Sequence, residues 1–224
     1  MLETVEQSTR PRVAWSVLWL HGLGADGHDF APIVPELVRA QWPGIRFVFP
    51  HAPVRPVTIN GGVPMRAWYD IRSLSAEDRA DEAGVRQSIA EVDALIARER
   101  DRGVPPARQL LVGFSMGGAM ALAAGLRREA PVAGIAALSA YLPLNSKTAA
   151  EMTAGGKATP VFMAHGTQDP VVAPAWGSRS RDAMQALGVQ VEWHTYPMPH
   201  SVHPQEVQDL GSWMQARFQD RAGG

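Results

Sequence analysis

Cysteine is absent from this chain of 224 residues, and several kinds of function depend on that residue. Disulfide bonds, thiolate nucleophiles and cysteine-based metal sites are therefore excluded. An excess of charge of one sign is also absent, because 21 basic and 22 acidic residues give a formal net charge of −1. We therefore expect no nucleic acid or other polyanion as a partner.

Long hydrophobic runs are missing as well. Residues 1–10 contain no apolar core of a signal peptide, and the first apolar run, residues 13–20, is too short to cross a bilayer. We therefore expect a soluble cytoplasmic protein without a membrane span. The length suits one domain, which we place at residues 13–220 after an N-terminal extension at residues 1–12.

Local motifs for metals and phosphates do not occur either. The chain has seven histidines, but none is arranged as H-E-x-x-H or with comparable ligand spacing. Walker A is absent, and Gly22-Leu23-Gly24 lacks the third glycine of G-x-G-x-x-G. We expect neither a metal nor a cofactor.

What the chain does contain is an alternation of short apolar runs with longer helical patterns. This alternation predicts an α/β fold, with a mostly parallel central sheet covered by helices on both faces. The expected strands are 13–20, 46–49, 110–113, 134–139, 161–165 and 191–196. The expected helices are 30–41, 81–102, 116–129, 174–187 and 204–218.

One long segment, residues 51–75, shows no clear periodicity and is rich in proline and glycine. A loop of that length in a compact domain is usually functional or disordered. Its aromatic residues Trp68 and Tyr69 favour order. The chain has no room for a large cap domain, so we expect an open groove.

The most informative motif is Gly113-Phe114-Ser115-Met116-Gly117, between an expected strand and an expected helix. G-x-S-x-G in this position is typical of the nucleophile elbow of α/β-hydrolases. The two glycines remove Cβ atoms where strand and helix meet, and Ser115 is left at a strained tip. The alternative is a glycine-rich turn whose serine only caps the helix.

A serine nucleophile needs a base, and the base needs an anion that fixes its tautomer. In α/β-hydrolases these partners follow the serine in the order acid, then histidine, in loops after strands. Asp169 lies directly after the strand expected at 161–165 and is the candidate acid. Three other aspartates after Ser115 lie in expected helices and are interpreted as solvated charges: Asp182, Asp209 and Asp220.

His200 is the candidate base, because it lies in the loop between the last expected strand and the final helix. His203, where that helix begins, and His194, within the strand, are the alternatives. His21 follows the first expected strand, and His165 precedes the loop that carries Asp169. We interpret both as structural residues that hydrogen-bond the backbone beneath the site.

An oxyanion hole requires backbone N–H groups directed at the developing negative charge. Met116 follows the nucleophile directly and should supply one donor. The loop His21-Gly22-Leu23-Gly24 follows an early strand, and Leu23 is the expected second donor.

These motifs resemble the carboxylesterase and acyl-protein thioesterase (lysophospholipase-like) family of small α/β-hydrolases. The matching segments are 20–30, 49–53, 66–71, 113–118, 165–172 and 196–200. The resemblance implies Ser115, Asp169 and His200 as the triad and Leu23 and Met116 as oxyanion donors. It also implies a substrate channel, for which the candidate lining residues are Leu74, Val171, Val172 and Trp176.

The chain departs from the family pattern at two positions. Met116 replaces a glutamine that many members carry after the nucleophile, and Tyr141 replaces a tryptophan before Leu142-Pro143. A backbone N–H is unaffected by a side-chain change, so both departures concern the substrate rather than the chemistry.

Together these features predict a serine hydrolase that cleaves short-to-medium acyl esters or thioesters through an acyl-serine intermediate. A lysophospholipid or an acylated protein is an alternative substrate. A peptidase or lactonase on the same fold and a catalytically silent binding module are the competing hypotheses. The sequence leaves a homodimer open, since no feature determines the oligomeric state.

Overall fold

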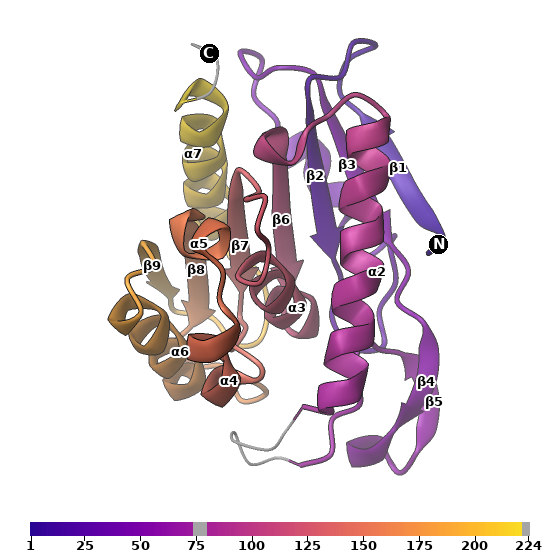
Figure 1. Ribbon diagram of the computed structural model, residues 1–224, viewed down its shortest axis with the longest axis vertical. Helices are drawn as coiled ribbons and strands as arrows, with labels where there is room; N and C mark the ends of the chain where they lie inside the picture. The colour runs from indigo at the N-terminus through magenta and orange to yellow at the C-terminus, as the bar shows by residue number, and fades with distance from the viewer. Residues whose placement is uncertain (74–79, 221–224) are drawn as a thin grey trace.

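The structure is a computed structural model that describes residues 1–73 and 80–220 (Figure 1). A seven-stranded sheet in the order β1-β3-β2-β6-β7-β8-β9 forms its centre. Only β1 runs antiparallel to its neighbour, β3, and the other adjacent pairs are parallel. The strands are β1 (Thr4–Ser8), β2 (Trp15–Leu20), β3 (Ile45–Pro50), β6 (Gln109–Phe114), β7 (Gly134–Leu138), β8 (Val161–Gly166) and β9 (Val191–Tyr196).

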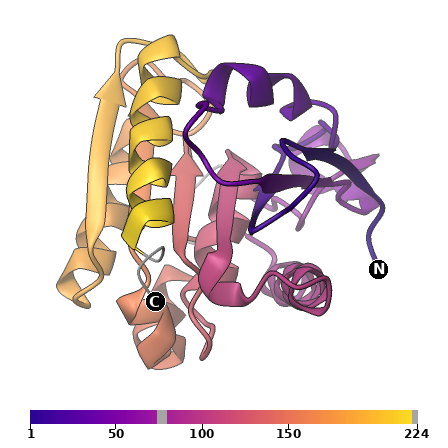
Figure 2. The ribbon, with the colours of Figure 1, turned by 90° about the horizontal axis from the view of Figure 1, so that it is seen from above.

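Helices cover both faces of the sheet, as Figure 2 shows from above. One face packs against α2 (Glu82–Asp101), α3 (Met116–Gly125) and α6 (Pro174–Ala186), whose apolar residues share one buried cluster with the strands. The opposite face packs against α1 (Val34–Leu37) and α7 (Pro204–Asp220) in a second cluster. The α/β architecture predicted from the sequence is therefore confirmed.

All six predicted strands form, but the structure adds a strand within the segment assigned to an N-terminal extension. β1 pairs with β3 from Thr4 opposite Pro50 to Ser8 opposite Arg46. Its side chains are only partly buried, so it lacks the continuous apolar run that marks the other strands. A short edge strand of this kind is determined by pairing rather than by local pattern.

The prediction of one helix over residues 30–41 is wrong, because the helical segment is much shorter. The segment forms a 3-10 turn, η1 (Ala31–Ile33), followed by the single turn of α1, and Val38 is already extended. Pro35 explains the break between the two turns, because it has no N–H to donate to the carbonyl of the preceding turn. The helix predicted at 116–129 likewise ends earlier, at Gly125. Two short helices were not predicted: α4 (Asn145–Glu151) and α5 (Ala154–Ala158).

The long segment predicted at 51–75 contains a small hairpin, with β4 (Val54–Val57) paired to β5 (Val63–Arg66) around the 3-10 turn η2 (Thr58–Asn60). Trp68 and Tyr69 follow the hairpin and are fully buried. Their burial agrees with the expectation that these aromatic residues favour an ordered segment. The Trp68 indole Nε1–H donates to the His21 carbonyl at 2.9 Å. The hairpin is therefore attached to the loop after β2.

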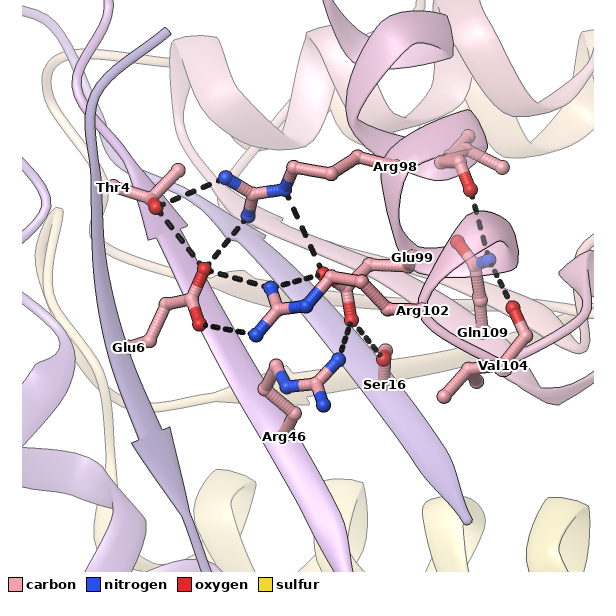
Figure 3. Close-up of polar contacts among 10 residues, drawn as sticks. Thr4, Glu6, Ser16, Arg46, Arg98, Glu99, Arg102, Val104 and Gln109 are labelled. Atoms are coloured by element: carbon pink, nitrogen blue, oxygen red, sulfur yellow. Dashed lines mark hydrogen bonds and ion pairs between the residues drawn. The ribbon is translucent and has the colours of Figure 1, made fainter. Parts of the chain in front are cut away.

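A buried ionic network joins α2 to the first three strands of the sheet (Figure 3). Glu99 is fully buried and accepts hydrogen bonds from Ser16 Oγ at 2.6 Å and from Arg46 at 2.8 Å. Arg102 donates both to Glu99 and to Glu6 on β1. Every charge of the network has a partner, which is the condition under which buried charges are tolerated.

The parallel strands all point their carboxyl ends toward the lower edge of the sheet in Figure 1. In open α/β sheets the loops at this edge carry the binding site. Across residues 1–73 and 80–220, no helix combines the length and the apolar character that crossing a bilayer requires.

Candidate active site

Ser115 lies at a sharp turn between β6 and α3. Its backbone has φ of 55° and ψ of −120°, which is a strained conformation for a residue with a side chain. A Cβ at Gly113 would overlap the Gly117 backbone, and a Cβ at Gly117 would overlap the Leu20 carbonyl. Both glycines are therefore required for this turn.

His200 lies between Ser115 and Asp169. Its Nε2 is 2.9 Å from Ser115 Oγ, and its Nδ1 is 2.7 Å from Asp169 Oδ2. A carboxylate only accepts, so Nδ1–H donates to Asp169 and Nε2 is left free to accept the Ser115 hydroxyl proton. This tautomer is the one that a general base requires.

The Asp169 carboxylate is held from both sides. Its Oδ1 accepts the N–H groups of Val171 at 2.8 Å and Val172 at 2.9 Å, which leaves Oδ2 for His200. The residue is 5% exposed, so water does not compete for these bonds. The loop after β8 thus orients the anion toward the imidazole.

The alternative bases and acids lie elsewhere. His203 accepts the Gln205 N–H through Nδ1, and His194 Nε2 lies 2.8 Å from Glu192. Among the other aspartates, Asp209 accepts the Tyr196 hydroxyl and Asp182 pairs with Arg181, while Asp220 is the last residue of α7. Of the three candidate histidines, His200 is the one that contacts Ser115.

The loop after β2 passes close to the serine. A Cβ built on Gly22 would lie 3.5 Å from Ser115 Cβ. Among the hydrogen bonds formed within the described residues, none uses the backbone N–H of Leu23 or of Met116. The first N–H groups of a helix have no intrahelical acceptor, so Met116 retains a free donor beside the serine.

The Met116 side chain is directed away from solvent. It is 3% exposed, and its Sδ accepts the Trp68 backbone N–H at 3.3 Å. The replacement of glutamine by methionine therefore affects the packing between the elbow and the segment after β5. The sequence offered no sign of this contact, because it joins two distant segments.

His21 and His165 hydrogen-bond the backbone, as predicted. His21 Nδ1–H donates to the Gly22 carbonyl at 2.7 Å, and Nε2 accepts the Ala52 N–H at 3.0 Å. His165 Nε2–H donates to the Val172 carbonyl at 2.9 Å. Burial lowers the pKa of both rings, so they remain neutral and support the loops that follow β2 and β8.

A cavity of about 660 Å³ lies between the segment after β7 and the first turns of α6. Trp176 lines it and meets Tyr141 edge to face at 6.1 Å between ring centroids. Val171 is 52% exposed, and Val172 is 3% exposed within the core, so neither contributes to this cavity wall. Leu74, the remaining candidate, lies outside the described residues.

Tyr141 also takes part in a contact that the sequence did not predict. Its hydroxyl lies 2.8 Å from the Tyr69 hydroxyl, and both rings are buried. The pair joins the segment after β5 to the segment after β7, and Tyr141 also helps to line the cavity. A tryptophan at position 141 would not supply this hydroxyl.

A mostly parallel sheet of this strand order, with a strained serine at the turn after its central strand, defines the class of the protein as an α/β-hydrolase. The model of the phospholipase/carboxylesterase family matches residues 2–217. The chain therefore belongs to the phospholipase/carboxylesterase family and is a hydrolase.

Curated relatives support this assignment over nearly the whole chain. Acyl-protein thioesterase 1 of Mycosarcoma maydis is 41% identical over 215 residues, which cover 89% of this chain and 90% of that protein. Acyl-protein thioesterase 1 of Cryptococcus neoformans is 39% identical over 216 residues, with coverages of 89% and 90%.

Solved structures agree with the sequence comparison. SOBER1 of Arabidopsis thaliana superimposes with a TM-score of 0.87 at 32% identity, covering 92% of this chain and 99% of that one. Acyl-protein thioesterase 2 of Zea mays gives a TM-score of 0.82 at 28% identity, with coverages of 96% and 99%.

Proposed function

We propose that this protein cleaves carboxylic esters or thioesters through an acyl-enzyme on Ser115. The observation that carries the proposal is the continuous hydrogen-bonded line from Asp169 through His200 to Ser115, with distances of 2.7 and 2.9 Å. A serine hydroxyl becomes a nucleophile only when a positioned base accepts its proton, and this geometry supplies such a base.

In the first half-reaction, Ser115 Oγ attacks the carbonyl carbon of the substrate while its proton passes to His200 Nε2. The carbonyl oxygen becomes an oxyanion, and the N–H groups of Leu23 and Met116 stabilise it. Asp169 stabilises the imidazolium without taking its proton. The bond to the leaving oxygen or sulfur then breaks, and the leaving group receives the proton from His200.

In the second half-reaction, a water molecule replaces the leaving group. His200 Nε2 takes a proton from this water as its oxygen attacks the acyl carbon. The second oxyanion is stabilised by the same two N–H groups. When the bond to Ser115 Oγ breaks, His200 returns a proton to the serine and the free acid leaves.

For the substrate, we propose a short-to-medium acyl group at Ser115. The cavity that Trp176 and Tyr141 line has neither Ser115 nor His200 in its wall, so we propose that it holds a part of the substrate distant from the reacting carbonyl. The cavity volume of about 660 Å³ falls within the range of small-molecule pockets. The curated relatives are named acyl-protein thioesterases, so an acylated protein is the favoured physiological substrate and a lysophospholipid the second candidate.

The nucleophile is tested by exchanging Ser115 for alanine. Ser115→Ala should lower kcat/KM on p-nitrophenyl butyrate by about 10⁴- to 10⁶-fold, because the attacking oxygen is lost. A fluorophosphonate probe should label the wild-type protein on Ser115 and leave the variant unlabelled. Labelling at another residue, or full activity in the variant, would contradict the proposal.

The substrate class is tested separately, with p-nitrophenyl esters of rising chain length beside a matched acyl thioester and amide. We expect rates on the ester and thioester to exceed the amide rate greatly, because an amine must be protonated before it leaves. A faster amide would favour the peptidase alternative without affecting the role of Ser115.

A further inference from the structure

Three side chains with metal-binding atoms meet beside the oxyanion loop. Asp26 and His28 lie in the loop that follows β2, and His51 directly follows β3. One ligand atom from each of the three lies within 4.8 Å of the other two. The sequence alone predicted no metal, because the third residue of this group comes from a distant segment.

The loop itself places the first two groups side by side. Asp26 Oδ1 accepts the His28 backbone N–H at 2.7 Å and lies 3.1 Å from Nδ1 of the His28 ring. A carboxylate and an imidazole nitrogen are thus already close enough to share one ion.

His51 is held against this loop through Gly27. The Gly27 N–H donates to His51 Nδ1 at 3.1 Å, so the lone pair of that nitrogen points toward the loop. A Cβ on Gly27 would overlap the Phe49 carbonyl, so only glycine lets the loop approach the end of β3 this closely. The His28 and His51 ring centroids consequently lie 5.4 Å apart.

We propose that Asp26, His28 and His51 bind a Zn²⁺ ion, with water completing a tetrahedral shell. Two imidazoles and one carboxylate are ligands that Zn²⁺ prefers, whereas Mg²⁺ and Ca²⁺ prefer oxygen alone. The side chains of His28 and Asp26 are 70% and 45% exposed, so an ion from solvent reaches them without any opening of the core. A ring nitrogen has one lone pair, so an ion at His51 Nδ1 would replace the hydrogen bond from the Gly27 N–H.

The proposed ion would join two segments that support the oxyanion loop. In this region the Ala52 N–H already donates to His21, and the Gly24 N–H donates to the Arg66 carbonyl at 2.8 Å. An ion that binds only the folded arrangement stabilises the folded state. Zn²⁺ binding is separate from ester cleavage, so Ser115→Ala should bind the ion as the wild type does.

The experiment uses the full chain without a histidine tag, freed of metal by chelation. Titration calorimetry with ZnCl₂ should give one site per chain, and thermal unfolding should show a rise in Tm that EDTA reverses. CaCl₂ and MgCl₂ at the same concentration should leave Tm unchanged. His28→Ala and Asp26→Asn should each weaken Zn²⁺ binding by at least about tenfold, since each removes a ligand.

His194→Ala is the matched control, because His194 is also a partly exposed histidine beside a carboxylate, at 2.8 Å from Glu192. This variant should bind Zn²⁺ as the wild type does. His28 is largely exposed, so its replacement by alanine leaves the fold intact. Unchanged Zn²⁺ binding in His28→Ala, or its loss in His194→Ala, would overturn the proposal.

Discussion

At the scale of the residue, Ser115 has a backbone conformation that a residue with a side chain disfavours. A positive φ costs a non-glycine residue on the order of 1–3 kcal/mol, and here the surroundings maintain it. Gly113 lets β6 approach the start of α3, and Gly117 lets α3 approach Leu20 at the end of β2. In this conformation the Ser115 hydroxyl lies 2.9 Å from His200 Nε2.

Two single substitutions distinguish the role of His200 from that of its neighbour His203. His200→Ala should lower kcat/KM by about 10³- to 10⁶-fold, because the base that contacts Ser115 is lost. His203→Ala should stay within about threefold of wild type, because that ring accepts the Gln205 N–H and stacks on Tyr196 but does not contact Ser115. Steady-state kinetics on one ester measures both. The reverse order of the two effects would show that the base is His203.

At the scale of the element, helix α7 begins with a buried carboxyl just after the loop that carries His200. Glu206 is fully buried, and its Oε2 accepts the His203 backbone N–H at 3.1 Å, as in a capping box. No hydrogen bond within the described residues reaches Oε1. Burial raises the pKa of Glu206 to about 7.

This raised pKa makes stability depend on pH. The folded state holds the Glu206 proton more tightly than the unfolded chain, so the free energy of unfolding falls as pH rises from about 4.5 to about 7. Glu206→Gln keeps the cap and removes the charge. The variant should therefore be more stable than wild type by up to about 3 kcal/mol at pH 8.5 and show little gain at pH 4.5. Urea unfolding of both proteins at pH 8.5 and pH 4.5 measures the difference in stability. An equal gain in stability at the two pH values would contradict the prediction.

At the scale of the whole molecule, the core consists of two clusters of buried apolar side chains, one on each face of the sheet. The Glu99 network adds a polar connection, since it joins the C-terminal end of α2 to β1, β2 and β3 (Figure 3). A buried ion pair of this kind gives modest net stability, but removing one partner leaves the other charge uncompensated.

Glu99→Ala should therefore lower the free energy of unfolding by about 3–5 kcal/mol, because Arg46 loses its buried partner. Asp101→Ala is the control, since its pair with Arg100 is exposed and should contribute less than about 1 kcal/mol. Urea unfolding of the three proteins provides the measurement. Equal losses in both variants would show that the network is no more important than a surface pair.

The fold class could be predicted from the sequence because its signals are local. Continuous apolar runs mark strands buried on both faces, and Gly113 reflects a clash within the five residues of the elbow. Candidate acid and base followed from their order along the chain. The prolines at 32 and 35 also carry a local signal, which the apolar pattern of that segment obscured.

The sequence by itself determined the α/β architecture, the elbow at Ser115 and the loops in which its partners had to lie. Only the tertiary structure decided which groups meet: His200 with Ser115, Tyr69 with Tyr141, and His51 with Asp26 and His28. It also decided that residues 4–8 form an edge strand. The physical reason is that local preferences depend on neighbours along the chain, whereas distances between side chains depend on how distant segments pack.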